Sequence, residues 1–168
     1  KRALGMPSFN KINQIIQLDS ALIVGADSGV FISYDNAENW TALKYGLRNP
    51  SVNALILDDS TWLAATNYGV YGSTDSGQAW EYRSNGINGT TSTSLAVKGE
   101  FIYSGSRYGG ISFTSDTSSN WTRGDSAIQN EYITKICTMG ALLFAGTIEN
   151  GVFKSDDNGW TWTPVNNG

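Results

Sequence analysis

Hydroxyl and carboxylate side chains recur together in this chain. At four places a serine or threonine is followed two residues later by an aspartate, and a tryptophan follows five residues after that. An aspartate at a turn can accept hydrogen bonds from backbone N–H groups that a hairpin leaves unpaired. Such oxygen-rich segments can also bind Ca²⁺, and Asp156, Asp157 and Asn158 are adjacent. The carboxylate spacing of an EF-hand loop and its distal glutamate are absent, however, so the pattern favours a structural turn without a metal.

These four turn segments lie in a fixed phase. They read SYDNAENW, STDSGQAW, TSDTSSNW and SDDNGWTW, and their tryptophans are 40, 41 and 41 residues apart. Equal spacing indicates a repeated structural unit. The residues expected to build the turns are Ser33, Asp35, Trp40, Ser73, Asp75, Gly77, Trp80, Thr114, Asp116, Trp121, Ser155, Asp157, Gly159, Thr161 and Trp162.

A second group of polar and aromatic side chains lies where the repeats differ most. Tyrosines can stack on sugar rings or anchor a protein interface, arginine can bind a carboxylate, and acidic side chains can accept sugar hydroxyls. Variation on a constant frame is typical of loop-borne binding sites. Solvated hairpin tips without a ligand are the alternative. The candidates are Asp27, Asn67, Tyr68, Arg107, Tyr108, Glu149 and Asn150. Loops between the repeats add weaker candidates at Arg48, Asn49, Asn88, Asn130 and Tyr132.

Each repeat predicts four short antiparallel strands in about 40 residues, which is the size of one β-propeller blade. Glycine is frequent, with 19 residues, and charged residues make up only 15% of the chain, as expected for short strands joined by tight turns. We therefore predict an all-β chain with a single propeller domain over 1–168. Its blades are expected at about 10–46, 51–86, 91–127 and 131–168.

The turn segments resemble the Asp-box, or BNR repeat, whose pattern is Ser/Thr-x-Asp-x-Gly-x-Thr-Trp. The fourth segment, SDDNGWTW, matches every position, whereas the second lacks the threonine and the first and third lack both the glycine and the threonine. The resemblance covers nearly the whole chain and implies an Asp-box β-propeller, with repeats like those of sialidases and sorting receptors. It also implies that ligands bind at the face opposite the Asp-boxes.

The presence of four repeats does not determine how the propeller is completed. Known Asp-box propellers typically have six or more blades. The chain could close as a four-bladed ring, two chains could form an eight-bladed homodimer, or the chain could be part of a longer propeller. Gly5 and Met6 resemble Gly46 and Leu47, so the sequence begins near the same position of the repeat as that at which it ends. An open arrangement would expose the face of a blade and favour association.

Composition excludes several function classes. The net charge is −4 and lysine and arginine do not cluster, so nucleic-acid binding is not expected. No apolar stretch is long enough for membrane insertion. The chain has no histidine, which removes histidine-based catalysis and metal ligation. The single cysteine, Cys137, lies in an apolar run and is expected to be buried. No cofactor is expected.

Three functional classes remain. The first is a non-catalytic propeller that recognises a protein or glycan through the loops of one face, with an extracellular or periplasmic location suggested by resemblance to secreted bacterial proteins. The second is a fragment of a glycoside hydrolase resembling sialidases or xyloglucanases. The arginine, tyrosine and carboxylate set of a sialidase is incomplete here, although Tyr108 and Glu149 would lie on adjacent blades. The third is a structural spacer in a secreted surface protein. We favour the non-catalytic binding module.

Overall fold

The computed structural model describes residues 5–7, 11–48, 51–57, 60–89, 91–115 and 120–167; Asp116 of the third turn segment and Asn49 lie outside them. Within these described residues, sixteen strands form four antiparallel sheets, and in each sheet consecutive strands lie side by side. The described residues contain no helix, and hence none that could span a membrane. This architecture confirms the predicted all-β fold of four four-stranded blades.

The strand bounds follow the sequence repeat. The first blade contains β1 (Ile12–Leu18), β2 (Ala21–Ala26), β3 (Gly29–Ser33) and β4 (Thr41–Ala42). The second contains β5 (Val52–Leu57), β6 (Trp62–Thr66), β7 (Gly69–Ser73) and β8 (Glu81–Tyr82). The third contains β9 (Ser92–Lys98), β10 (Phe101–Ser106), β11 (Gly110–Thr114) and β12 (Thr122–Arg123). The fourth contains β13 (Ile133–Met139), β14 (Leu142–Thr147), β15 (Val152–Ser155) and β16 (Thr163–Pro164).

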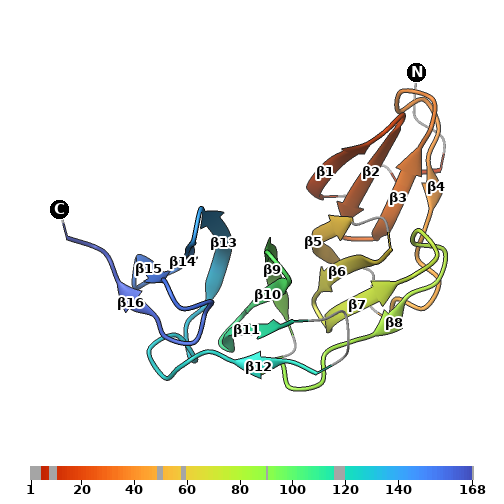
Figure 1. Cartoon of the computed structure of the whole chain (residues 1–168). Helices are drawn as coiled ribbons and strands as arrows, with labels where there is room; N and C mark the ends of the chain where they lie inside the picture. The colour runs from red at the N-terminus through yellow and green to blue at the C-terminus, as the bar shows by residue number, and fades with distance from the viewer. Residues whose placement is uncertain are drawn as a thin grey trace.

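The blades form an open arc, with the first and the last blade at its two ends (Figure 1). Inter-blade contacts join β1 and β2 to β5, β5 and β6 to β9, and β9 and β10 to β13. The core therefore lies between successive blades. Ile23 and Ile32 of the first blade, for example, pack in one cluster with Leu55 and Tyr71 of the second. Each two-layer contact buries apolar side chains that a lone sheet would leave in water.

Three of the four turn-segment tryptophans help to fill these layers, whereas Trp40 packs against the first blade alone. Trp80 and Trp121 are buried, and each indole N–H donates to a backbone carbonyl of the preceding blade, at Leu43 (2.9 Å) and Arg83 (2.8 Å) respectively. Gly46 lies directly against the Trp80 carbonyl, where a Cβ would clash. Trp80 and Trp121 therefore connect adjacent blades as well as completing the turns.

Inside the turn segments the serine and the aspartate act as a pair. Ser155 Oγ donates to Asp157 Oδ1 (2.8 Å) and accepts from the Gly159 N–H (2.9 Å). Asp157 then accepts from the Thr161 N–H (2.9 Å) and, through Oδ2, from the Thr161 hydroxyl (2.7 Å). The segments at 33–40 and 73–80 repeat the serine and aspartate bonds. These bonds satisfy N–H groups of the hairpin that no strand partner reaches.

The same bonds lower the pKa of the aspartates. Burial raises the pKa of Asp157, but the bonds from Thr161 and Ser155 outweigh that effect and bring it below the ordinary value of 3.8. The pKa values of Asp35 and Asp75 are also lowered, chiefly by the backbone N–H four residues further along. Each hydrogen bond to the carboxylate favours its charged form.

The expectation that Cys137 is buried is wrong, because the side chain is exposed. Neighbouring Ile136 is buried against the third blade, so Cys137 points to the opposite side of the last blade. At the matching positions, Ile16 and Ile56 are partly covered by the blade that follows. In this structure no following blade covers Cys137, which is why sequence hydrophobicity alone gave the wrong answer.

Candidate functional site

The predicted binding loops lie at the same end of every blade, which we call the loop end. The loop between the second and third strands of each blade bonds through a backbone N–H to the residue just before the first strand. Three of these bonds join Asn67 to Ser51 (3.3 Å), Arg107 to Thr91 (2.9 Å) and Ile148 to Tyr132 (3.2 Å). The turn segments connect the third and fourth strands, so they lie at the other end of each antiparallel sheet.

Arg107 and two tyrosines form a cluster at the loop end. The guanidinium carbon of Arg107 lies 5.2 Å from the centre of the Tyr132 ring and 5.7 Å from that of Tyr108. The two rings meet edge to face, with centres 5.6 Å apart. Tyr108 is 66% exposed. The stacking holds the guanidinium in place by cation–π attraction and leaves an aromatic surface open to a ligand.

A cavity of about 230 Å³ adjoins this cluster. It brings together Arg107, Tyr108, Glu149 and Asn150, four of the residues predicted from the loops. Its acidic side is organised by Asn150, whose Nδ2 donates to both carboxylate oxygens of Glu131 at 3.0 Å. The cavity thus combines a cation, carboxylates and two tyrosine rings, which suits a ligand with both polar and apolar groups.

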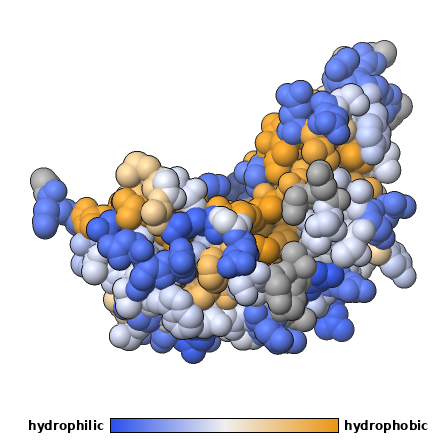
Figure 2. All heavy atoms as spheres, viewed as in Figure 1, coloured by the Kyte–Doolittle hydropathy of each residue, from blue (hydrophilic) through white to orange (hydrophobic). Residues whose placement is uncertain are grey.

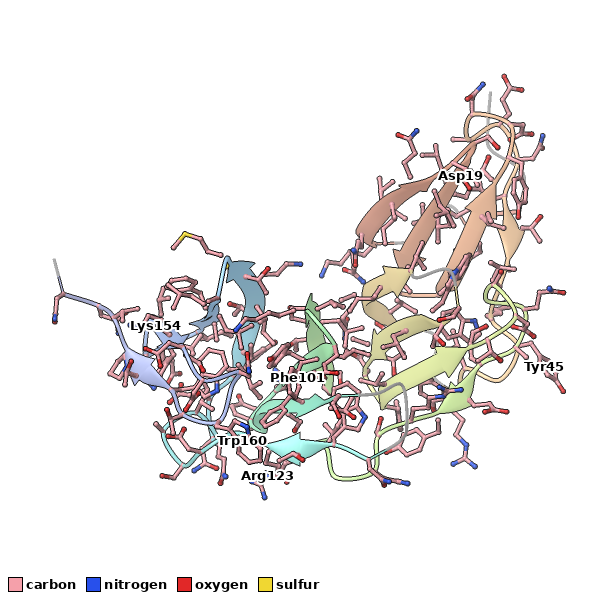
Figure 3. All side chains as sticks on the ribbon, viewed as in Figure 1. Asp19, Tyr45, Phe101, Arg123, Lys154 and Trp160 are labelled. Carbon is pink, nitrogen blue, oxygen red and sulfur yellow. The ribbon has the colours of Figure 1, made fainter. Side chains whose placement is uncertain are left out.

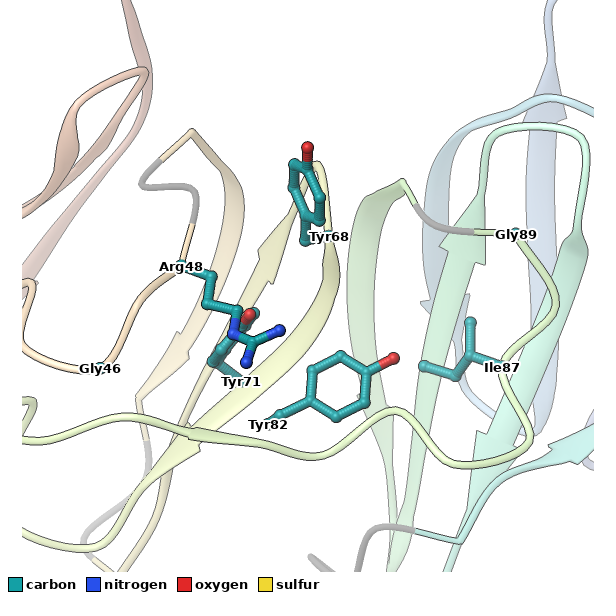
Figure 4. Close-up of a pocket in the computed structure, with 7 residues that line it drawn as sticks. All are labelled: Gly46, Arg48, Tyr68, Tyr71, Tyr82, Ile87 and Gly89. Carbon is teal, nitrogen blue, oxygen red and sulfur yellow. The ribbon is translucent and has the colours of Figure 1, made fainter.

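A larger cavity of about 710 Å³ lies at the second blade (Figure 4). Tyr68 projects from the β6–β7 loop, and Arg48 comes from the connection that leads into β5. Tyr71 is buried beneath them and meets the exposed ring of Tyr82 edge to face, with ring centres 5.6 Å apart. Three tyrosines and one guanidinium form most of the wall, so the cavity offers large ring surfaces and one cation.

Asp27 and Asn67 have a different environment from the other predicted residues. Asp27 Oδ1 accepts from Asn13 Nδ2 (3.0 Å) and from Ser51 Oγ (3.4 Å). Asn67 Oδ1 accepts from Asn53 Nδ2 (3.1 Å). Neither residue lines either cavity. Both are positioned to fix the loops against the first strand of their own blade, and their role in ligand binding stays a prediction.

Sequence reasoning missed Glu131, Tyr71 and Tyr82 and gave little weight to Arg48 and Tyr132. Tyr71 could have been noticed because the first and fourth blades carry phenylalanine at the matching position, Phe31 and Phe153. The approach of Tyr132 to Arg107 depends on the angle between the third and fourth blades, which the repeat pattern does not define. Within the described residues, no three potential metal-binding side chains lie together.

Comparisons with known proteins identify the fold. No protein-family model matches the chain, and no curated protein does. Many solved structures do match. The chain aligns over 97% of its length with an extracellular domain of a hybrid two-component system from B. thetaiotaomicron, with a TM-score of 0.77, 15% identity and 22% of that domain covered. It aligns over 92% of its length with an ancestral GH74 enzyme, with a TM-score of 0.75, 17% identity and 24% of that enzyme covered.

The chain is a β-propeller by fold. It also aligns over 99% of its length with YCF48 from Cyanidioschyzon merolae, with a TM-score of 0.71, 15% identity and 62% of that chain covered. A further structure, of YCF48 bound to a D1 peptide, aligns over 93% of this chain and 52% of that one, with a TM-score of 0.66 and 15% identity. The chain thus spans about a quarter of the length of the enzyme and between half and two thirds of YCF48. The similar structures include enzymes and non-enzymes, and together they establish the propeller fold of this chain.

Proposed function

We propose that this chain is a non-catalytic propeller module that binds a segment of a protein partner across its loop end. The observation that carries the proposal is the pair of cavities at that end, each lined by an arginine and tyrosines, of which Tyr68, Tyr82 and Tyr108 are exposed. Tyrosine and arginine are the residues that most often supply binding energy at protein interfaces. The YCF48 structure with a D1 peptide supports a peptide ligand for a propeller of this kind.

In this proposal the two cavities bind different parts of the partner. Tyr68 and Tyr82, which are 53% and 57% exposed, receive an apolar or aromatic side chain. Arg107, held between Tyr108 and Tyr132, pairs with an acidic group of the same segment. The turn segments act as Asp-boxes that hold the blades from the opposite end. An extracellular or periplasmic location accompanies this proposal.

Binding to random peptide and glycan arrays tests the proposal. We expect peptides, and no glycans, to be retained, and Arg107→Ala and Tyr68→Ala each to weaken the best peptide at least about tenfold, as loss of an interface hot spot does. Tyr34→Ala is the matched control, because Tyr34 is 73% exposed but belongs to a turn segment. Glycan retention without peptide binding, or equal loss with Tyr34→Ala, would contradict the proposal.

A glycoside hydrolase fragment is the second candidate, supported by the likeness to a GH74 enzyme and by Glu131 and Glu149 in one cavity. Turnover of xyloglucan oligosaccharides that is lost in Glu149→Gln would establish it and refute the non-catalytic assignment. Paired carboxylates are the groups that such hydrolysis requires.

A further inference from the structure

Successive blades are joined by one recurring hydrogen bond at their inner strands. The second residue of each first strand donates from its side chain to the backbone carbonyl that opens the first strand of the next blade. The three bonds run from Asn13 to Val52 (2.9 Å), from Asn53 to Ser92 (2.8 Å) and from Thr93 to Ile133 (2.5 Å). We call these side chains the connectors. They give every junction within the chain the same register.

A recurring steric fit accompanies the connector. The second strand carries a small residue near its end, which we call the socket, at Gly25, Ala65, Gly105 and Gly146. A Cβ on Gly25 would lie 3.0 Å from Val52 and 3.2 Å from Leu55, and one on Gly105 would lie 2.5 Å from Ile133. The socket is therefore small because the first and fourth residues of the next blade's first strand fill the space beside it.

The last blade presents a socket and a connector that no blade fills in this structure. Among the residues that the structure describes, a Cβ on Gly146 would meet only Thr134 Oγ1, at 3.2 Å, and the Lys135 carbonyl, at 4.0 Å, both in its own blade. The connector residue, Thr134, bonds to the Gly146 carbonyl of its own blade (2.9 Å), as Thr93 also does to the Gly105 carbonyl (3.1 Å). Phe144 lies on the side of this blade that faces away from the third blade, and its side chain is partly exposed. Figure 3 shows the last blade, on which Lys154 is labelled.

The first blade presents the matching side chains at the other end of the arc. Ile12 and Ile15 are 38% and 65% exposed, whereas at the matching positions Val52 and Leu55 are 0% and 3% exposed. Figure 2 shows hydrophobic surface on the first blade towards the concave side of the arc and further hydrophobic surface over the last blade. One end thus has the side chains for a junction, and the other end has the unfilled socket.

We propose that a second copy of this chain docks here, so that Ile12 and Ile15 of each copy fill the Gly146 socket of the other. Thr134 then donates to the backbone carbonyl of Ile12 in the partner copy, as Thr93 does to Ile133 within the chain. Each copy uses both ends, which closes the assembly around a two-fold axis. Two arcs of four blades give eight, which lies within the usual range for propellers.

The docking partner is a second copy of the chain, because the chain itself carries both halves of the junction. Three junctions of this kind already exist between its blades, and the remaining halves lie on opposite ends of one molecule. The contact involves chiefly the inner strands, because Met6 and Trp40 already pack against Val24 and Phe31 on the outer part of the first blade. The proposal does not depend on what the loop end binds.

Sedimentation equilibrium over a concentration series tests the proposal. We expect the wild-type chain to have twice the 18.1 kDa chain mass. Ile15→Arg puts a charge into the junction, and Gly146→Val fills the socket. Because the proposed dimer is symmetric, each change is present at both of its junctions. We therefore expect either variant to raise the dissociation constant at least about 100-fold. Tyr45→Arg is the control, because Tyr45 is 78% exposed on the outer side of the arc (Figure 3).

Mixing the two variants separates loss of contact from loss of folding. The Ile15→Arg chain keeps a normal socket, and the Gly146→Val chain keeps a normal Ile15, so an equimolar mixture can form one intact junction. We expect each variant to be monomeric alone and the mixture to form dimers. A monomeric wild type at all concentrations, larger open assemblies, unaffected variants, or a mixture that stays monomeric would each overturn the proposal.

Discussion

At the scale of single residues, two adjacent aspartates in the fourth turn segment differ sharply. Asp157 accepts bonds from Ser155 and from both donors of Thr161, whereas Asp156 is largely exposed and lies 3.8 Å from Lys154. We expect Asp157→Asn to destabilise the fold by about 1–2 kcal/mol, because charge-assisted bonds to turn N–H groups are lost.

Thermal unfolding measures this difference. In a domain of this size a loss of 1–2 kcal/mol lowers Tm by about 3–6 °C. The control, Asp156→Asn, should change stability by less than about 0.5 kcal/mol, because exposed ion pairs contribute little. Equal effects of the two substitutions would show that the hydrogen bonds of Asp157 do not stabilise the turn.

The lowered pKa values of Asp35, Asp75 and Asp157 predict acid sensitivity. Since their pKa is lower in the folded chain than the ordinary 3.8, the unfolded chain binds protons more readily on acidification. The stabilisation is complete above pH 3.8 and is lost as the pH falls through the lowered values. We expect Tm to drop as the pH falls below about 4, and the drop to be smaller in Asp157→Asn. Identical pH profiles would contradict this assignment.

Residue types alone predicted the turn hydrogen bonds, but they did not predict how the side chains of the candidate site meet. The serine and aspartate bonds are local in sequence, so the motif determines them. Arg107 and Tyr132 come from different loops and meet only after the third and fourth blades pack. Asp27 and Asn67 looked like free loop-tip groups, yet both bond to the first strand of their own blade.

At the scale of strands and sheets, the socket position predicts that two glycine substitutions destabilise the fold to different extents. A Cβ at Gly105 would lie 2.5 Å from Ile133 of the next blade, whereas one at Gly146 meets no other blade. We expect Gly105→Ala to cost about 1–3 kcal/mol through overpacking and Gly146→Ala to cost less. Urea unfolding in the Ile15→Arg background measures both without a contribution from association. A cost at Gly146 equal to that at Gly105 would refute the assignment of the junction.

The strands themselves were predictable because each repeat carries its own boundary signals. Small residues end the second strand, glycines at 29, 69, 110 and 151 begin or immediately precede the third, and the tryptophan precedes the fourth. The burial of Cys137 was not predictable in the same way, since it depends on whether a neighbouring blade covers that face.

At the scale of the whole molecule, association predicts a concentration-dependent Tm. Binding between folded chains stabilises them by mass action, and the effect grows with protein concentration. We expect Tm of the wild-type chain to rise by several degrees over a hundredfold increase in concentration, and Tm of Ile15→Arg to stay constant. Differential scanning fluorimetry at matched concentrations measures both. A constant wild-type Tm would contradict association of the folded chains.

Sequence repeats predicted the number of blades but left the closure of the ring open. Closure depends on the angle between neighbouring blades, which arises from side-chain volumes in the layers between them. Those volumes differ from junction to junction, as Ala65 differs from Gly25 and Gly105. Only the structure shows the first and the last blade at separate ends of an arc (Figure 1).

The recurring connector and socket also bear on how such a chain can change in length. The connector bond recurs at each junction beside a small socket residue, so we expect a duplicated unit of 41 residues inserted at a blade boundary to find the same bonding partners on both sides. A deletion or insertion of half a unit would instead place a third strand where a first strand belongs. Growth or shortening by whole units is therefore expected to keep a connector and a socket at every junction.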